Sequence, residues 1–177
     1  MELVCPSYNN IVVLALGSNC GNMLSHIKSA INMLPLYNIT YSYVYKSMAL
    51  LPENASSDWD TPFFNMVVSG YTNLSPNFML ERVKYIEKKL GRFNNEHWSP
   101  RCIDIDIILW GDKIIDEKHL SIPHKHMQDR DFVLVPLSDI HARFPHPKLK
   151  LSVQEMILNL HEINLIKQNK YILYNHL

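Results

Sequence analysis

This sequence of 177 residues contains few cysteines and glycines, three and five respectively. It also has no net charge, because 17 Lys and Arg balance 17 Asp and Glu. Three cysteines, an odd number without the spacing of a metal site, argue against a disulfide framework and favour free thiols in a reducing compartment. The zero net charge argues against a sequence-independent nucleic-acid binder, which needs a basic excess. A small anionic ligand held by a local group of cations is compatible with this composition.

Long hydrophobic runs are missing as well. No apolar stretch reaches the roughly 18 residues of a membrane span, and the first residues, MELVCP, lack the basic region of a signal peptide. We therefore expect a cytoplasmic protein without a membrane partner. With 47% hydrophobic and 19% charged residues the composition is that of a globular protein, and residues 1–177 are expected to form a single domain.

The common motifs of nucleotide sites and hydrolases are also absent. No G-x-x-x-x-G-K-[ST] segment occurs, which excludes a P-loop at the level of the motif. The protein-kinase motifs, the G-x-S-x-G elbow and the H-E-x-x-H metal helix do not occur either. Any chemistry on a nucleoside triphosphate must therefore use side chains and a metal ion in place of a glycine-rich cradle.

Hydrophobic periodicity predicts six main elements in the order βαββαβ. They are, in chain order, a strand over 11–16, a helix over 23–34, strands over 39–47 and 63–71, a helix over 76–90 and a strand over 102–109. Ser75 and Pro76 mark the start of the second helix, and Gly91 marks its end. This order predicts a ferredoxin-like α+β fold, in which an antiparallel sheet carries helices on one face and leaves the other face free for a ligand.

Additional C-terminal elements follow the main pattern. They are an apolar segment over 133–137 that fits a helix or a strand, a helix over 152–160 and an edge strand over 171–173. Three stretches have no periodicity and are expected to be loops: 50–62, 92–101 and 116–131. Loops of this length inside a compact domain are either functional or disordered.

The most informative segment is the strand that contains Asp104 and Asp106. Side chains alternate along a strand, so the two aspartates share one face. The other face is expected to carry Ile103, Ile105, Ile107 and Leu109. Carboxylates at positions i and i+2 lie roughly 6.5–7 Å apart at Cα and can bind one hard cation jointly, or two cations bridged by a substrate oxygen. A solvent-facing acidic strand is the alternative, and the pair alone favours that alternative.

The charges around this strand favour a cation site over a solvent-facing acidic strand. Residues 82–101 contain six Lys and Arg against two acidic residues, whereas residues 102–131 contain seven acidic and four basic residues. Arg92 and Arg101 flank a stretch without periodicity, where a solvated helix face does not explain them. Arginine side chains on phosphate oxygens, opposite a carboxylate-bound Mg²⁺, would account for both halves of this charge distribution.

His124 and His126 have the H-x-H spacing of some metal sites. Histidines in loops more often serve as hydrogen-bonding groups, and two carboxylates make the better site for a hard cation. We therefore expect these histidines to form loop hydrogen bonds.

Seven short motifs along the chain form a specific combination. They are LGSN at 16–19, FFN at 63–65, GR at 91–92, WSPRCIDIDI at 98–107, IPH at 122–124, RDF at 130–132 and PL at 136–137. In order and spacing they resemble the 6-hydroxymethyl-7,8-dihydropterin pyrophosphokinase family of folate synthesis, over about residues 11–160. The block W-x-P-R-x-x-D-x-D-I, with P-H and R-x-F downstream, is a specific signature.

The resemblance implies the transfer of pyrophosphate from ATP to the hydroxymethyl group of the reduced pterin, with release of AMP. ATP is then a co-substrate, and two Mg²⁺ ions hold its phosphates while the pterin hydroxyl attacks the β-phosphorus in line. Asp104 and Asp106 match the metal ligands and are implied to be catalytic. Arg92 and Arg101 match catalytic arginines of a mobile loop.

The resemblance also implies ligand contacts by position. The implied pterin-binding residues are Ser47, Leu50, Phe63, Asn65, Trp98 and Phe132. The implied ATP-binding residues are Lys84, Arg92, Trp98, Arg101, Ile107, Ser121, His124 and Arg130. In this assignment Phe63 and Phe132 stack on the two sides of the pterin ring, and Trp98 closes over the site.

Two other functions are compatible with parts of the pattern. A different two-metal nucleotidyl or phosphoryl transferase on a similar sheet would also use the aspartate pair, but it would not need Phe63, Asn65 and Phe132 together. A ferredoxin-like RNA-binding module would use the basic loop, but the RNP aromatic signature is missing and an acidic pair opposes a phosphate backbone. We expect a monomer that binds small-molecule substrates and no nucleic acid, and we leave association with other folate-pathway enzymes open.

Overall fold

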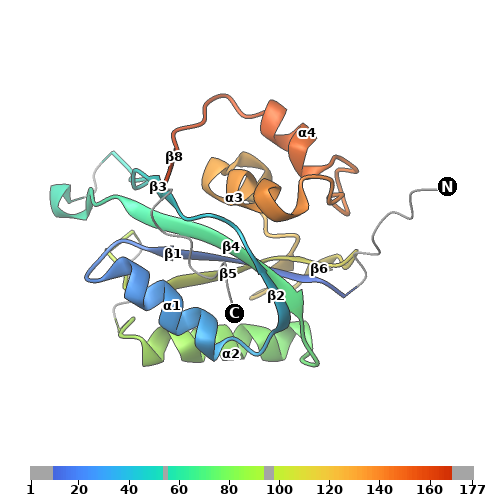
Figure 1. Cartoon of the computed structure of the whole chain (residues 1–177), viewed down its shortest axis with the longest axis horizontal. Helices are drawn as coiled ribbons and strands as arrows, with labels where there is room; N and C mark the ends of the chain where they lie inside the picture. Colours follow the sequence, from blue (N-terminus) through green and yellow to red (C-terminus); the bar gives the residue numbers. More distant parts are fainter. Residues whose placement is uncertain (1–9, 54–55, 94–97, 169–177) are drawn as a thin grey trace.

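A six-stranded antiparallel sheet forms the centre of the structure (Figure 1). The structure is a computed structural model and describes residues 10–53, 56–93 and 98–168. The strands of the sheet are β1 (Val12–Ser18), β2 (Tyr37–Tyr41), β3 (Tyr45–Ser47), β4 (Phe63–Tyr71), β5 (Asp104–Trp110) and β8 (Ile166–Lys167). They are ordered β5-β1-β4-β3-β8, and β2 also pairs with β4. The predicted α+β fold with an antiparallel sheet is confirmed.

Helices α1 (Met23–Met33) and α2 (Pro76–Lys89) cover one face of the sheet, below it in Figure 1. The side chains of Asn22 and Ser75 cap them by accepting hydrogen bonds from backbone N–H groups of the first turn. Gly91 ends α2 with a φ of +100°, a conformation that favours glycine. The core on this face includes Val12, Leu14, Leu16, Ile27, Ile31, Met66, Val68, Val83, Ile86, Ile105 and Ile107. Burying each such aliphatic side chain contributes about 1.5–3 kcal/mol.

Helices α3 (Asp131–His141) and α4 (Val153–Leu158) lie on the opposite face, above the sheet in Figure 1. The expectation that this whole face is free for a ligand is therefore wrong where α3 packs on β4. The ambiguous segment 133–137 is helical, because its apolar residues face the sheet at helical spacing and outweigh the cost of Pro136 inside the helix. The second core includes Val13, Val67, Ile108, Leu109, Met127, Val133, Leu134, Leu137, Phe144, Val153 and Met156.

The single strand expected over 39–47 is divided into β2 and β3. Tyr41 and Tyr45 pair with β4 residues that are only three positions apart, so one extra residue forms a bulge between them. The bulge reverses the alternation of side chains. Val44 is consequently buried, whereas Tyr43 is exposed.

A second bulge lies in β5. In the register between β1 and β5, Ile108 is an additional residue. Ile107 packs toward α1 and α2, while both Ile108 and Leu109 belong to the core on the α3 side. The expectation that Leu109 shares a face with Ile107 is therefore wrong. Asp104 and Asp106 precede the bulge and share one face of the sheet, as predicted.

Short elements occur where loops were expected. They are β6 (Ile115–Asp116), β7 (Ser121–Ile122) and the 3-10 helices Ser57–Trp59 and Met127–Asp129. β6 and β7 pair as a two-stranded sheet inside the segment that includes the expected loop 116–131. β8 was not predicted, since it is two residues long and depends on pairing with β3. The edge strand expected over 171–173 lies outside the described residues.

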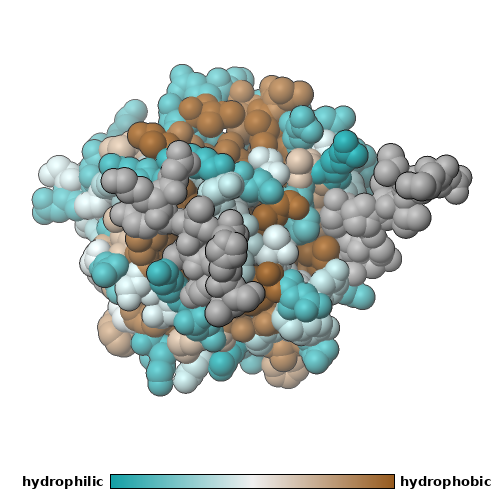
Figure 2. Space-filling model, in the orientation of Figure 1, coloured by the Kyte–Doolittle hydropathy of each residue, from teal (hydrophilic) through white to brown (hydrophobic). Residues whose placement is uncertain are grey.

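Apolar side chains also reach the surface of the protein. Figure 2 shows them gathered toward the top of the view, over the region of α3 and α4. The exposed large apolar residues of the C-terminal part include Leu149, Leu158, Ile163 and Ile166. None of the helices among the described residues combines the length and apolar character needed to span a bilayer.

Candidate active site

Three neighbouring strands bring candidate residues to one end of the sheet. Gly17 of β1 lies in register between Asp104 of β5 and Asn65 of β4. Residues paired directly across strands project their side chains to the same face. A Cβ atom at Gly17 would lie 3.2 Å from the Oδ1 atom of Asn65 and 3.5 Å from the ring of Phe63. The glycine therefore keeps the space between Asp104 and Asn65 open.

An open cavity lies over this end of the sheet. The residues predicted to contact the pterin all line this first cavity: Ser47, Leu50, Phe63, Asn65, Trp98 and Phe132. Arg101, Asp104, Asp106 and Arg130 line it as well. The fold thus collects in one place side chains from segments that are far apart in the sequence.

Buried polar groups form the inner wall of the first cavity. Asn65 and Ser47 are both buried, and the Asn65 Nδ2 donates a hydrogen bond of 2.8 Å to the Ser47 hydroxyl. This bond fixes the orientation of the amide and directs its oxygen toward Gly17. A fixed amide of this kind can hydrogen-bond the polar edge of a flat heterocycle.

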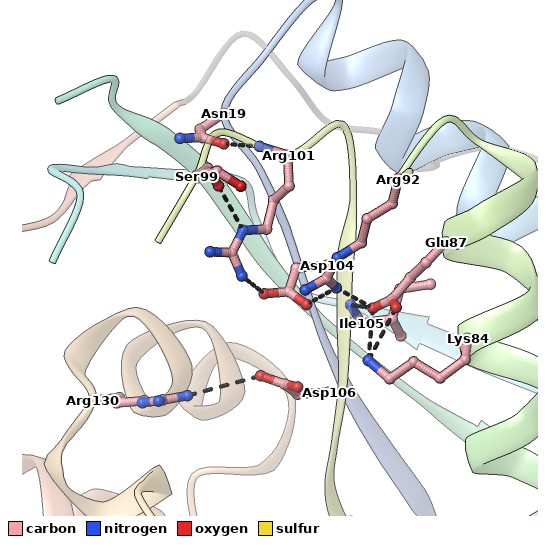
Figure 3. Close-up of polar contacts among 10 residues, drawn as sticks. All are labelled: Asn19, Lys84, Glu87, Arg92, Ser99, Arg101, Asp104, Ile105, Asp106 and Arg130. Atoms are coloured by element: carbon pink, nitrogen blue, oxygen red, sulfur yellow. Dashed lines mark hydrogen bonds and ion pairs between the residues drawn. The ribbon is translucent and has the colours of Figure 1, made fainter. Parts of the chain in front are cut away.

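Asp104 lies at the centre of a cluster of charged side chains (Figure 3). Its Oδ1 accepts a hydrogen bond from Arg92, and its Oδ2 accepts one of 2.9 Å from Arg101. Burial by itself raises the pKa of Asp104, but the two arginines and Lys84 outweigh it and hold the pKa below its ordinary value. Asp104 is therefore ionised at neutral pH, and its charge is matched by cations of the protein.

Glu87 anchors this cluster from α2 and was not predicted as a site residue. Its buried carboxylate accepts hydrogen bonds of 2.7 Å from Arg92, 3.0 Å from Lys84 and 2.8 Å from the Ile105 N–H (Figure 3). Burial raises the pKa of Glu87, and these donors reduce the effect without cancelling it. Glu87 thus ties α2 to both Arg92 and β5.

A signal for Glu87 was present in the sequence. It follows Val83 by one helical turn, which places it on the buried stripe of α2. A charged residue on a buried stripe needs hydrogen-bond partners or counter-charges, because its desolvation is otherwise costly. Such a residue is a candidate for the anchor of a polar cluster.

Asp106 has a weaker partner than Asp104. It forms an ion pair with Arg130, whose Nη1 lies 3.8 Å from its Oδ2 (Figure 3). Burial and the charge of Asp104 raise the pKa of Asp106, and nearby basic groups offset this only in part. Asp106 therefore lacks a full complement of positive charge, which a bound cation would supply.

A second cavity opens on the other side of Asp106. It is lined by residues predicted to contact ATP: Lys84, Ile107, Ser121 and His124. Asp106 lines both cavities. Arg92 is not among the described residues that line either cavity, and it reaches the site through its bond to Asp104.

The histidine loop beside the second cavity is held by hydrogen bonds. The His124 N–H donates to the Ile108 carbonyl at 3.0 Å, which attaches the loop to β5. The His124 Nδ1 accepts a hydrogen bond of 3.3 Å from the His126 N–H. The expected role in loop hydrogen bonding is confirmed for the His124 ring, whereas His126 contributes its backbone N–H.

Asn19 holds the segment that carries Arg101. Its Oδ1 accepts a 2.7 Å hydrogen bond from the Arg101 N–H, and its Nδ2 donates one of 2.8 Å to the Thr61 hydroxyl. The Arg101 Nε donates to the Ser99 carbonyl at 3.2 Å. Trp98, just before, has a φ of +72°, a backbone conformation that costs energy outside glycine and is frequent at functional sites. Asn19 was part of a recognised motif, but its clamping role was not predicted.

The two aspartates fit a magnesium site in their donor chemistry. Both offer hard oxygen ligands, and Mg²⁺ is commonly held by one or two carboxylates, with water and substrate phosphates as its other ligands. Across the parts of the chain that the structure describes, no three His, Cys, Asp or Glu residues are grouped to hold a metal. The two carboxylates fit a metal whose other ligands are water and substrate phosphates.

A model of the family described as 7,8-dihydro-6-hydroxymethylpterin-pyrophosphokinase matches residues 13–142. The chain belongs to this family. The matched region runs from β1 to just beyond the end of α3. It therefore contains Asp104 and Asp106 as well as Arg92 and Arg101.

Pyrophosphokinase relatives match this chain over most of their own length. A 2-amino-4-hydroxy-6-hydroxymethyldihydropteridine pyrophosphokinase of Aquifex aeolicus is 38% identical over 146 residues, which is 81% of this chain and 88% of that protein. The Haemophilus influenzae protein of the same name is 31% identical over 160 residues, or 88% of this chain and 96% of its own.

Other relatives are longer. A folate synthesis bifunctional protein of Chlamydia trachomatis is 38% identical over 136 residues, or 74% of this chain, and the chain spans only 30% of its length. Among solved structures, Plasmodium falciparum HPPK-DHPS with pteroate has a TM-score of 0.68 at 18% identity, covering 89% of this chain and 47% of that one. At this identity the likeness shows a shared fold.

Proposed function

We propose that this protein transfers pyrophosphate from ATP to the hydroxymethyl group of 6-hydroxymethyl-7,8-dihydropterin and forms AMP and the pterin diphosphate in folate biosynthesis. The observation that carries the proposal is the position of Asp106, which lines both the cavity with the pterin candidates and the cavity with the ATP candidates. A carboxylate at the boundary between two substrates can hold a metal ion that orients both reacting groups. Membership of the family and the names of the relatives support the same reaction.

In the first cavity the pterin is held by stacking and by hydrogen bonds. Phe63 and Phe132 stack on its two sides, since flat rings gain from parallel contact as well as from burial. The amide of Asn65, fixed by Ser47, bonds the polar edge of the ring and orients the hydroxymethyl group toward the aspartates. Trp98 closes over the mouth of the cavity and excludes water from the reacting groups.

The nucleotide occupies the second cavity, where Lys84, Ser121 and His124 contact it beside Ile107. In this proposal the β-phosphate lies near Asp106 and faces the pterin hydroxyl. Arg130 lies 3.8 Å from Asp106 and is placed to contact the phosphates from the α3 side.

Arg92 and Arg101 exchange partners during the reaction. In this structure both bind Asp104, and with ATP bound their guanidinium groups move to phosphate oxygens, which they bind through paired N–H donors. There they stabilise the negative charge that develops in the transition state. Glu87 also binds the Arg92 Nη1 group from α2 and so orients this arginine before ATP binds.

Asp104 and Asp106 are proposed to hold two Mg²⁺ ions. When bound, such ions would neutralise the negative charge of the triphosphate and stabilise the attacking and leaving oxygens. The exchange of the arginines makes room at Asp104, and the incomplete charge compensation of Asp106 favours a cation there.

The test is a direct assay of the reaction. The protein is incubated with ATP, Mg²⁺ and 6-hydroxymethyl-7,8-dihydropterin, and the nucleotide products are separated by anion-exchange chromatography. AMP is expected, and its formation should stop when EDTA removes the metal or when the pterin is omitted. Formation of ADP, or of AMP without pterin, would replace the proposal with a different phosphoryl or nucleotidyl transfer.

We also propose the ferredoxin-like plan for the sheet. Its support is that β1 lies between β4 and β5 while β4 lies between β1 and β3, so the two β-α-β units interleave. Helices α1, α2 and α3 contact this sheet and α4 packs on α3, which supports a single domain over residues 1–177. A cytoplasmic monomer without a nucleic-acid partner stays a prediction. The existence of bifunctional folate-synthesis relatives supports association with other enzymes of that pathway.

A further inference from the structure

The fold brings together two cysteines that are 82 residues apart in the sequence. The Sγ atoms of Cys20 and Cys102 lie 3.3 Å from each other in a thiol–thiol hydrogen bond. Both residues are free cysteines and half-buried. A side-chain movement of about 1 Å would bring the sulfurs to the disulfide bond length of about 2.05 Å. This contact is not part of the proposed reaction.

The backbone beside the two cysteines is already held in place. The Asn19 N–H donates a hydrogen bond of 3.1 Å to the Arg101 carbonyl, and the Asn19 Oδ1 accepts one of 2.7 Å from the Arg101 N–H. Cys20 and Cys102 each follow one of these residues. Disulfide formation requires two chain segments at a short and fixed separation, and these hydrogen bonds provide it in the reduced protein.

We propose that Cys20 and Cys102 form a redox modification site that closes reversibly into an intramolecular disulfide. The oxidant is a low-molecular-weight disulfide, RSSR. One protein thiolate attacks RSSR and displaces one RSH, and the second protein thiol then displaces the other RSH from the mixed disulfide. The two protein thiols thereby lose two protons and two electrons, which leave on two RSH molecules. A thiol reductant reverses both steps.

Proximity, rather than high thiol reactivity, distinguishes this site. Burial, together with the hydrogen bond to Cys102, raises the pKa of the Cys20 thiol to about 11. The first attack on the oxidant is therefore expected to be slow. Once a mixed disulfide exists, the second thiol is at contact distance, so ring closure is strongly favoured over accumulation of the adduct.

The disulfide would restrain Arg101, the neighbour of Cys102. The side chain of Arg101 binds Asp104 in this structure and transfers to phosphate in the proposed reaction. A covalent bond to Cys20 limits that movement, so the oxidised protein is expected to turn over more slowly. This consequence rests on the proposed function, whereas formation of the disulfide does not.

The first experiment detects the bond. A Cys5→Ser protein retains only these two cysteines, so any intramolecular disulfide must join them. After incubation with excess oxidised glutathione, we expect the loss of both maleimide-reactive thiols and a Cys20–Cys102 linked peptide in a non-reduced digest. Cys20→Ser and Cys102→Ser, each made in this background, should instead carry one glutathione. Two glutathione adducts or two free thiols in the Cys5→Ser protein would overturn the proposal.

The second experiment measures the effect on catalysis. AMP formation by the cross-linked Cys5→Ser protein should fall at least about fivefold, if restrained loop movement limits turnover, and recover with dithiothreitol. The Cys20→Ser/Cys102→Ser protein should keep its turnover in the same oxidant. Full turnover in the cross-linked protein would overturn the restraint on Arg101. If the reduced protein makes no AMP, the proposed function fails, and the peptide analysis still decides whether the disulfide forms.

Discussion

Asp104 and Asp106 stand two residues apart on one strand and face the same way, yet their surroundings differ. Arg92 and Arg101 both bind Asp104, whereas Asp106 has an ion pair with Arg130 at 3.8 Å. Burial raises the pKa of both carboxyl groups, but the net pKa is lowered for Asp104 and raised for Asp106. The difference shows that neighbouring charges, not position along the strand, determine how a carboxylate behaves.

The two aspartates also differ in how much positive charge the protein places beside them. On the Asp104 side the protein supplies its own cations and fixes one of them through Glu87. On the Asp106 side positive charge is incomplete, and the carboxylate lies where the two cavities meet. In the proposed function, the arginines of the first side later bind phosphate, and the second side binds a metal ion.

The largest effect is expected from removing either carboxylate. Asp104→Ala and Asp106→Ala should each lower turnover at least about 100-fold, the scale of one lost charge contact in a transition state. Their stabilities should differ. Asp104→Ala leaves two arginines without this partner and should lower the free energy of unfolding by about 1–3 kcal/mol. Asp106→Ala should leave it unchanged or slightly higher. AMP formation and urea unfolding measure the two quantities.

Asp112→Ala is the control for this pair, since Asp112 is an exposed acidic residue just after β5. It should leave turnover and stability unchanged. Equal losses of stability in the two aspartate variants would show that the charge difference between their surroundings has no energetic consequence. Near-normal turnover in either variant would return that aspartate to a surface role.

The next largest effect is expected from substitutions of Glu87, which binds Arg92 beside Asp104. Glu87→Ala removes the buried carboxylate that accepts hydrogen bonds from Arg92, Lys84 and the Ile105 N–H, and the free energy of unfolding should fall by about 3 kcal/mol. Turnover should fall about 10–100-fold, as is typical when an outer partner of a site residue is lost. Glu87→Gln should recover part of the stability, because its amide oxygen can still accept from the Ile105 N–H.

Glu81→Ala, on the exposed face of the same helix, is the matched control. Turnover of Glu87→Gln decides the interpretation. If the carboxylate charge orients Arg92, the glutamine should stay well below the natural protein in AMP formation even where its stability recovers. Recovery of both quantities together would assign Glu87 a purely structural role.

A smaller effect is expected at the aromatic wall next to Asp106. The Arg130 guanidinium carbon lies 5.5 Å from the ring centre of Phe132, and in the proposed function the same ring stacks on the pterin. Phe132→Leu should raise the KM for the pterin by about tenfold, which corresponds to the loss of one stacking contact. The KM for ATP should change less. Phe78→Leu, an exposed phenylalanine of α2, is the control; an equal rise in both KM values would argue against a pterin contact.

The smallest effect is expected in the pH dependence of folding stability, and it involves a histidine rather than the two aspartates. Burial lowers the pKa of His141, whose Nε2 lies 2.8 Å from the Ser69 hydroxyl. The unfolded chain therefore takes up a proton at higher pH than the folded protein. The contribution of His141 to the free energy of unfolding should therefore be fully present above about pH 6.5 and decline as the pH falls below it. His141→Gln should flatten this decline in urea unfolding series, whereas His161→Gln, at an exposed position, should not. An unchanged slope in His141→Gln would contradict this assignment.

Local features of the fold followed from the sequence because short-range rules govern them. Ser75 and Pro76 begin α2 as predicted, and Gly91 ends it. The alternation around Asp104 and Asp106 correctly placed them on one face, since a strand projects successive side chains to opposite sides. The pterin candidates, carried by a resemblance of motifs, all line one cavity.

The failures share a different cause. The bulge at Ile108, which moves Leu109 to the other face, exists only in the register with β1. The position of α3 on the supposedly free face depends on long-range packing against β4. Glu87 becomes a site residue only because the end of α2 lies beside β5. Single-sequence periodicity contains no information on which distant segment will be the partner.

The amino-acid sequence was sufficient to predict α1, α2 and the acidic pair on one face, because these features depend on residues that are close in the chain. The motif combination that marks the family could also be found in the sequence, because it consists of residue types at set positions. Tertiary structure alone decided which cation faces which carboxylate. It gave Asp104 two arginines, left Asp106 between two cavities, and brought Cys20 within 3.3 Å of Cys102. The physical reason is that charge compensation and thiol proximity depend on distances of a few ångströms between segments, which only the packed chain defines.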